Sequence, residues 1–171
     1  VEDALKKLAL NRAERRKQRQ KNGIPQVSIV GYTNAGKSTL LNRLTKSDVV
    51  AENQLFATLD PTSRRYRFPQ EREIIVTDTV GFIEDLPKTL VNAFKATLEE
   101  LDTADLLLHV LDASDKHVDD HKIGVDVILK DLNLSDKPMV LVWNKADIAD
   151  PIALDELRRN HNGLAISATT G

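Results

Sequence analysis

The sequence predicts an α/β fold of three layers, in which helices cover both faces of a mostly parallel sheet that includes one antiparallel strand. Two observations support this prediction. Segment 31–38 reads G-x-x-x-x-G-K-S and follows a short apolar run, which is the strand, loop and helix order of a phosphate-binding loop. Further along, apolar runs alternate with segments of helical periodicity, as in parallel sheets with crossover helices. Together these features are typical of the phosphate-loop NTPase fold.

The first half of the fold is expected to contain three strands and one helix. Residues 27–30 form an apolar strand, and 37–44 form a helix with leucines at helical spacing. The polar stretch 45–63 is too long for an ordinary connection, so it is a candidate functional loop. Strands over 64–68 and 73–77 flank a short Pro-Gln turn and are expected to pair as a hairpin.

The second half is expected to alternate strictly between helices and strands. Its strands are continuously apolar, as expected for strands that are covered on both faces. In such sheets ligands bind at the carboxyl ends of the strands. In chain order we expect a helix over 90–101, a strand over 106–111, a helix over 118–132, a strand over 139–143, a helix over 151–160 opened by proline, and a strand over 164–166.

The length and composition of the chain limit the kinds of protein it can be. The chain has 171 residues, of which 41% are hydrophobic, so one domain can bury a core without metal or disulfide support. The sequence has no cysteine, which excludes disulfides, thiolate metal sites and cysteine nucleophiles. No apolar run approaches the roughly 20 residues that span a bilayer. We therefore expect a soluble, cytoplasmic protein, and we also expect it to be a monomer.

The charge is unevenly distributed along the chain. Residues 1–22 carry eight Lys or Arg against three Asp or Glu, whereas the net charge of the whole chain is −2. This segment lacks Gly and Pro and is expected to be a basic helical linker from a missing preceding domain. It could contact RNA phosphates, or it could be an ordinary solvated helix. Residues 23–171 are expected to form a nucleotide-binding domain that is truncated at its C-terminus.

The glycine-rich loop is the first candidate site. Its glycines let successive backbone N–H groups face a phosphate at the N-terminus of the next helix. Lys37 is expected to reach the β- and γ-phosphates, and the Ser38 hydroxyl is expected to bind the bridging magnesium ion. The expected nucleotide contacts of this segment are Gly31, Tyr32, Thr33, Asn34, Ala35, Gly36, Lys37, Ser38 and Thr39.

A second motif, Asp78-Thr79-Val80-Gly81, follows the strand expected over 73–77. An aspartate at a strand end can hold magnesium through water, which makes Asp78 a candidate metal ligand together with Ser38. Gly81 has no side chain, so its backbone N–H can approach the γ-phosphate closely. All four residues are expected to contact the nucleotide.

A third motif, Asn144-Lys145-Ala146-Asp147, follows the strand expected over 139–143 and resembles the N-K-x-D motif of guanine-nucleotide-binding proteins. The resemblance implies that Asp147 accepts hydrogen bonds from guanine, that Asn144 assists, and that the Lys145 stem packs on the base. Adenine has no donor at N1 and would leave the carboxylate unpaired. By the same resemblance, Ser167-Ala168 is the remaining base-contacting segment, with the Ala168 N–H directed at the base oxygen.

The segment Phe56-Ala57-Thr58-Leu59-Asp60-Pro61-Thr62 narrows the resemblance to the HflX branch of the Obg–HflX group of GTPases. This resemblance implies hydrolysis of GTP to GDP and phosphate with Mg²⁺, and binding to the large ribosomal subunit in ribosome rescue or assembly. It implies nucleotide contacts from Phe56 through Asp60 and makes Thr58 the switch threonine and a magnesium ligand, with Thr62 as the competing candidate. The expected catalytic residues are Lys37, Thr58 and Gly81.

Phe82 follows Gly81 where Ras-like enzymes have a glutamine that orients the attacking water. Phenylalanine cannot do this, so we expect slow hydrolysis that needs outside help. Related GTPases place a potassium ion beside the phosphates through an asparagine positioned like Asn34; the alternative is that Asn34 only suits a tight turn. Two other functions stay open: an Obg-like or Era-like assembly or tRNA-modification GTPase, and a GTP-occupancy switch with incidental hydrolysis.

Three other polar or aromatic features are expected to be structural. His117 and His121 lie four residues apart beside two aspartates, and we assign them to an exposed helix start rather than to a metal site. His109 and Trp143 lie in apolar strands and are expected to be core residues.

Overall fold

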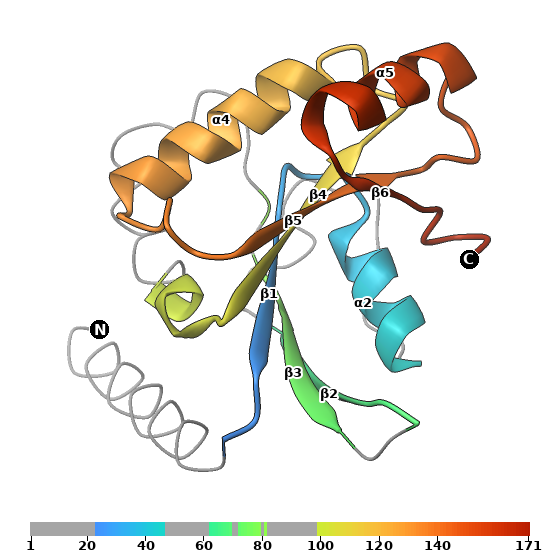
Figure 1. Cartoon of the computed structure of the whole chain (residues 1–171). Coiled ribbons are helices and arrows are strands. Elements are labelled where there is room, and N and C mark those ends of the chain that lie inside the picture. The colour runs from blue at the N-terminus through green and yellow to red at the C-terminus, as the bar shows by residue number, and fades with distance from the viewer. Residues whose placement is uncertain (1–22, 47–61, 70–71, 80, 82–98) are drawn as a thin grey trace, which may run out of the picture.

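A computed structural model describes residues 23–46, 62–69, 72–79, 81 and 99–171. Within these ranges the chain forms one sheet with the strand order β2-β3-β1-β4-β5-β6 (Figure 1). The strands are β1 (Gln26–Val30), β2 (Thr62–Arg67), β3 (Glu73–Asp78), β4 (Leu106–Asp112), β5 (Met139–Asn144) and β6 (Leu164–Ala165). The helices are α2 (Lys37–Thr45), α4 (Val118–Asp131) and α5 (Pro151–His161), with a 3₁₀ helix η1 (Glu99–Thr103).

All neighbouring strands pair in parallel except β2 and β3, which form an antiparallel hairpin. In register, Ile29 of β1 lies beside Asp78 of β3, and Asp112 of β4 lies beside Asn144 of β5. The carboxyl ends of the five parallel strands β3, β1, β4, β5 and β6 therefore meet at one edge of the sheet. Four of the predicted motifs lie at these strand ends: the phosphate loop after β1, and the segments that begin at Asp78, Asn144 and Ser167 at the ends of β3, β5 and β6.

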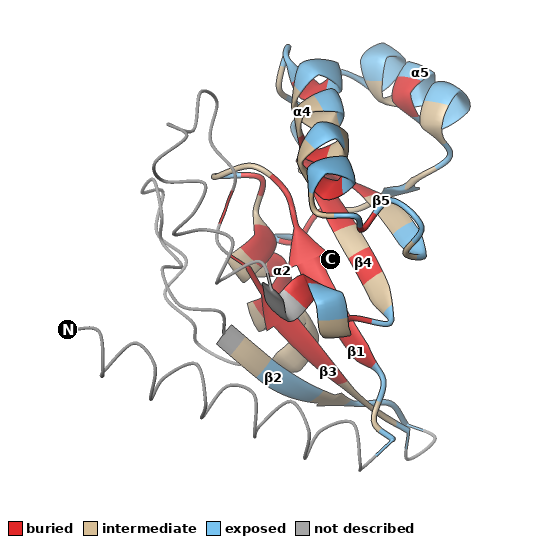
Figure 2. Cartoon of the chain, turned by 90° about the vertical axis from the view of Figure 1, so that its left-hand side faces the viewer, coloured by how far each residue is buried: buried red, intermediate tan, exposed pale blue. Residues whose placement is uncertain are grey.

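The helices form two layers, with α2 on one face of the sheet and α4 and α5 on the other (Figure 1). Residues of the central strands alternate between the two faces: Ile29 packs with Leu41 of α2, and its neighbour Val30 packs with Val125 of α4. All five residues of β1 are buried, as expected for a central strand covered on both faces (Figure 2).

The helix ends follow from local sequence. Asp150 caps α5 by accepting hydrogen bonds from the N–H groups of Ile152 and Ala153, both at 3.0 Å, and Pro151 occupies the first turn. By contrast, α2 begins after Gly36 without a side-chain cap. Its first N–H groups therefore face the edge of the sheet where the strand ends meet, ready for an anionic ligand.

The predicted elements agree with the described ones in type and order. Most boundaries differ by at most one residue, and two differ by more: β2 already begins at Thr62, inside the predicted loop 45–63, and η1 is a 3₁₀ turn that continues two residues past the helix predicted to end at 101. The β2 extension arises because Thr62 and Ser63 pair with Asp78 and Thr77, which sequence periodicity does not reveal. The predicted basic helix 1–22 lies outside the described residues, as does segment 90–98. In the described part of the chain, no helix has the length and apolarity needed to span a bilayer.

Candidate nucleotide-binding site

The glycine-rich loop has the backbone that its sequence predicts. Gly31 and Gly36 adopt positive φ angles of 147° and 92°, and Asn34 lies in the left-handed region at 62°. A side chain at Gly31 would collide with the Val110 carbonyl, and one at Gly36 would collide with the Asn144 amide. The loop is therefore pressed against the ends of β4 and β5.

Lys37 is buried, with 6% of its surface exposed, and its Nζ donates a hydrogen bond to the Tyr32 carbonyl at 2.7 Å. The side chain thus folds back over the loop that precedes it. Burial lowers the Lys37 pKa to about 8, and the nearby Asp78 carboxylate partly opposes the shift. An anion that enters the loop would stabilise the protonated amine.

Ser38 and Asp78 bring two oxygen groups together at the edge of the sheet. The Ser38 hydroxyl donates to Asp78 Oδ2 at 2.6 Å, and Asp78 is fully buried. The Thr79 hydroxyl donates to the Ile29 carbonyl at 2.6 Å, which fixes the segment after β3 to β1. Hydroxyl and carboxylate oxygens are the ligands that Mg²⁺ prefers.

Gly81 lies against the phosphate loop. A β-carbon built at Gly81 would lie 2.8 Å from Lys37 Nζ and 2.9 Å from Thr33 Cγ2. The absence of a side chain therefore lets the Gly81 backbone come close to the lysine.

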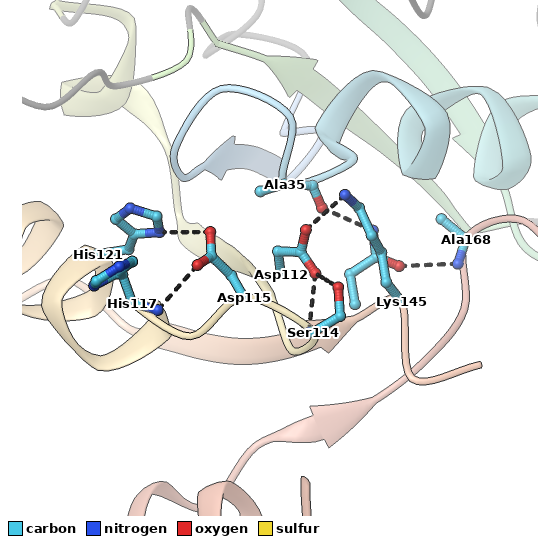
Figure 3. Close-up of polar contacts among 9 residues, drawn as sticks. Ala35, Asp112, Ser114, Asp115, His117, His121, Lys145 and Ala168 are labelled. Atoms are coloured by element: carbon cyan, nitrogen blue, oxygen red, sulfur yellow. Dashed lines mark hydrogen bonds and ion pairs between the residues drawn. The ribbon is translucent and has the colours of Figure 1, made fainter. Parts of the chain in front are cut away.

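Asn144 connects three parts of the site. Its amide Nδ2 donates to the Ala35 carbonyl at 2.8 Å, and its Oδ1 accepts from the Ala168 N–H at 2.9 Å (Figure 3). This is the N–H that the family resemblance directs at the base oxygen; in the structure it is bonded to Asn144. The side chain is buried, so both bonds are shielded from water. The phosphate loop, the end of β5 and the segment after β6 are thereby held together.

Lys145 and Asp147, which the resemblance also places against the base, differ in environment. Lys145 has a φ of 61° and donates from Nζ to Asp112 Oδ2 at 2.6 Å. Asp147 is exposed, and no hydrogen bond or ion pair within the described ranges engages its carboxylate. The carboxylate is thus open to external donors.

Segment 56–60, including the predicted switch residue Thr58, lies outside the described residues, and so does Val80. The competing candidate Thr62 is the first residue of β2, opposite Asp78. Ser167 is buried, and its hydroxyl accepts from the Thr170 N–H at 3.0 Å, which shapes the turn after β6.

The structure adds a group of residues that sequence reasoning did not connect with the site. Tyr32 of the loop stacks on His121 of α4, with ring centroids 4.2 Å apart, and Gly124 leaves room for the Tyr32 hydroxyl. His121 is therefore half-buried against the loop, not exposed as predicted. A cavity of about 150 Å³ lies between this loop and the segment that joins β4 to α4, where Asp112 and Asp115 lie. The only signal in the sequence was the position of Asp112 at a strand end.

His109 and Trp143 are fully buried, which confirms their prediction as core residues. Neither the His109 ring nitrogens nor the Trp143 Nε1 has a hydrogen-bond partner in the described part of the chain. They line the face of the sheet under α4 and α5 and take no part in the edge where the motifs meet.

Residues 26–145 match the model of a family described as 50S ribosome-binding GTPase. The chain belongs to this family of GTPases. The match confirms the prediction of a GTPase domain, and the family is one that binds guanine nucleotides.

Individual relatives agree with this assignment. The chain is 52% identical to the GTPase HflX of Caldanaerobacter subterraneus subsp. tengcongensis, over 88% of this chain and 35% of the relative. It is 45% identical to the GTPase HflX of Escherichia coli, over 100% of this chain and 41% of the relative. The predicted resemblance to HflX-type GTPases is therefore confirmed. The chain spans between a third and a half of the length of these relatives.

The fold is also that of a solved GTPase. The structure of Era in complex with MgGDPNP and nucleotides 1506–1542 of 16S ribosomal RNA superposes with a TM-score of 0.72 at 28% identity, covering 86% of this chain and 52% of that chain. This confirms the predicted three-layer phosphate-loop fold with one antiparallel pair of strands.

Proposed function

We propose that this chain is the domain that binds GTP and hydrolyses it to GDP and phosphate in an HflX-type GTPase. One observation carries the proposal: the phosphate loop, the Asp78–Gly81 segment and the 144–147 segment meet at one edge of the sheet. The Asn144 amide links the 144–147 segment directly to the phosphate loop, by donating to the Ala35 carbonyl at 2.8 Å, and it also accepts from the Ala168 N–H after β6 at 2.9 Å. Phosphate-binding and base-binding groups are therefore held in one fixed arrangement.

The base end of the site favours guanine. Asp147 is exposed and its carboxylate is open to two donors, which guanine presents together at N1 and its exocyclic amine. Adenine would leave the carboxylate without these partners. Lys145 and the segment Ser167-Ala168 would complete the base contacts, as the N-K-x-D resemblance implies.

The phosphate end suits a nucleotide with Mg²⁺. The Ser38 hydroxyl and the Asp78 carboxylate would hold the ion, which supplies positive charge against the phosphate oxygens when it is bound. Lys37 would contribute a further charge, and the Gly81 N–H would bond a γ-phosphate oxygen. Thr58 would add a switch contact that depends on the γ-phosphate.

The ribosome is the proposed partner. Support comes from the family description, which names the 50S ribosome, and from the relatives, which are HflX GTPases. A ribosomal partner in turn implies a cytoplasmic location. The basic segment 1–22 would provide positive charge for RNA phosphates at the junction with a preceding domain.

The guanine assignment is tested by Asp147→Asn. The asparagine amide replaces one acceptor oxygen with a donor, so GTP binding should weaken by a factor of roughly ten or more, and xanthosine triphosphate should bind better than to the parent. Competition binding with GTP, ATP and xanthosine triphosphate measures the change. Asp150→Asn is the matched control, because this exposed aspartate caps α5 and should leave selectivity unchanged. Unchanged selectivity in Asp147→Asn would contradict the assignment.

A further inference from the structure

Asp112 is the last residue of β4 and makes separate contacts through its two carboxylate oxygens. Oδ1 accepts from the Ser114 N–H at 3.0 Å and from the Ser114 hydroxyl at 2.6 Å. Oδ2 accepts from Lys145 Nζ at 2.6 Å (Figure 3). The serine therefore fixes the carboxylate on one side, and the other side is left to hold the lysine.

The register of the sheet brings these residues together. Asp112 of β4 lies beside Asn144 of β5, and the Ala113 N–H donates to the Asn144 carbonyl at 2.9 Å. Lys145 follows Asn144 directly and has a left-handed φ of 61°. The Asn144 side chain holds the phosphate loop, while the Lys145 side chain is held by Asp112 of the neighbouring strand β4.

The contact is partly shielded from water. The side chains of Asp112 and Lys145 are 18% and 32% exposed. Burial alone would raise the Asp112 pKa, but the hydrogen bonds from Lys145 and Ser114 outweigh it, and the pKa lies below its usual value. The carboxylate is therefore ionised at neutral pH, and its bond to the ammonium group is charge-assisted on both sides.

We propose that Asp112 is a positioning residue that holds the Lys145 side chain in place against the guanine ring and thereby slows dissociation of the nucleotide. The inference rests on the proposed function, because it requires guanine at the 144–147 segment. A lysine side chain loses substantial rotamer freedom when it is fixed, and the Asp112 contact removes that freedom before the nucleotide arrives. Asp112 itself contacts the ammonium group at the end of the Lys145 side chain, so it need not touch the base.

Asp112→Asn tests the proposal with little change of shape. Asparagine has one acceptor oxygen, so it cannot serve Ser114 and Lys145 together. Release of a fluorescent GDP analogue from the full-length protein, measured by stopped flow, should accelerate by a factor of about ten, which corresponds to one charge-assisted bond. Asp119→Asn is the matched control on α4, because the Asp119 side chain is 65% exposed and contacts His161 rather than Lys145, and it should change the rate less than twofold.

A double-mutant cycle separates positioning from simple support of the loop. In a Lys145→Met background, Asp112→Asn should accelerate release no further, because the side chain through which it acts is absent. Equal acceleration in both backgrounds would overturn the inference. If the parent protein bound no GDP, the proposed function would fail and the inference with it.

A second variant guards against loss of fold. Ser114→Ala keeps the Asp112 carboxylate but removes one of its anchors, so release should accelerate two- to threefold, again only when Lys145 is present. Melting temperatures measured without nucleotide show whether each variant is folded. An unchanged release rate in both folded variants would overturn the inference.

Discussion

The amide of Asn144 shows why its position requires asparagine. The side chain donates at one end to a carbonyl and accepts at the other from an N–H, and both partners belong to other segments of the site. Aspartate could accept but not donate, and leucine could do neither. Either replacement would leave a buried backbone group without its bond, which typically costs about 1–3 kcal/mol. The same residue is thus needed for the fold and for the site.

His109 allows a prediction about stability and pH. Its side chain is fully buried, and this burial lowers its pKa to about 4. The nearby Asp126 raises the pKa and Lys122 lowers it further. In the unfolded chain the histidine has its ordinary pKa of about 6.5. Between pH 6.5 and 4 the unfolded chain therefore binds more protons at this residue than the folded chain does. The free energy of unfolding should therefore fall as the pH decreases through this window.

The measurement is urea denaturation of the parent and of His109→Leu from pH 7 to pH 4. The parent should lose roughly 3 kcal/mol more than the variant across the window, because the variant has no ring to protonate. His117→Gln serves as a control, since the His117 side chain is 69% exposed and the variant should follow the parent. Parallel curves for parent and His109→Leu would contradict the prediction.

At the scale of elements, the phosphate loop and α2 separate stability from binding. Lys37 and Ser38 are polar residues at the start of α2, whereas Leu41, one turn further along, is fully buried in the core. Burial of the Lys37 charge disfavours the folded state, as its lowered pKa shows. The start of the helix is therefore arranged for a ligand and its middle for packing.

Lys37→Ala and Ser38→Ala should weaken GDP binding by roughly tenfold or more, because each removes a group aimed at phosphate or magnesium. Melting temperatures without nucleotide should stay close to that of the parent. Leu41→Ala is the contrasting variant, which should lose about 2–5 kcal/mol of stability through a cavity in the core. Unfolding of Lys37→Ala or Ser38→Ala would show that the two residues are structural.

The elements also show which features of the structure sequence patterns can predict. Apolar runs and glycine signals predict the strands, helices and their order, because burial on both faces and turn geometry are local properties of the chain. Sequence patterns do not predict the contact of Asp112 with Lys145, because it depends on the register of β4 against β5. They do not predict the Tyr32–His121 stack either, because it depends on how α4 packs beside the phosphate loop.

At the scale of the whole molecule, the rate of GTP hydrolysis depends on how the attacking water is oriented, and the sequence has no glutamine after Gly81 to orient it. Phe82 lies outside the described residues, but it follows Gly81, which lies above Lys37. The isolated domain should therefore hydrolyse GTP slowly, and large ribosomal subunits should accelerate it, since external charge stabilisation in this class contributes about 10³–10⁵-fold. Single-turnover assays with 50S subunits, 30S subunits or neither would measure this.

The outcomes separate the competing functions. Acceleration by 30S subunits alone would favour an Era-like role, since the solved Era complex contains 16S ribosomal RNA. Tight GTP binding without turnover under any condition would favour an occupancy switch. Fast turnover by the isolated domain would contradict the need for help.

Potassium is tested in the same assay by replacing sodium at constant ionic strength. Asn34 is exposed on the phosphate loop at a φ of 62°, so Asn34→Gly removes the side chain and keeps the backbone conformation. Potassium should raise the rate of the parent and leave that of Asn34→Gly unchanged. Equal rates of the parent in the two salts would remove potassium from the mechanism.

The two edges of the sheet bear on how the protein behaves at high concentration. An open strand edge can pair with another chain and seed aggregation. Here one edge is β6, which has only two residues, and the other is β2, whose Arg64, Arg65 and Arg67 are exposed. A short edge offers few free backbone groups, and an edge that carries positive charges repels its own copy. The arginines of β2 therefore favour solubility of the folded domain over addition of a further strand.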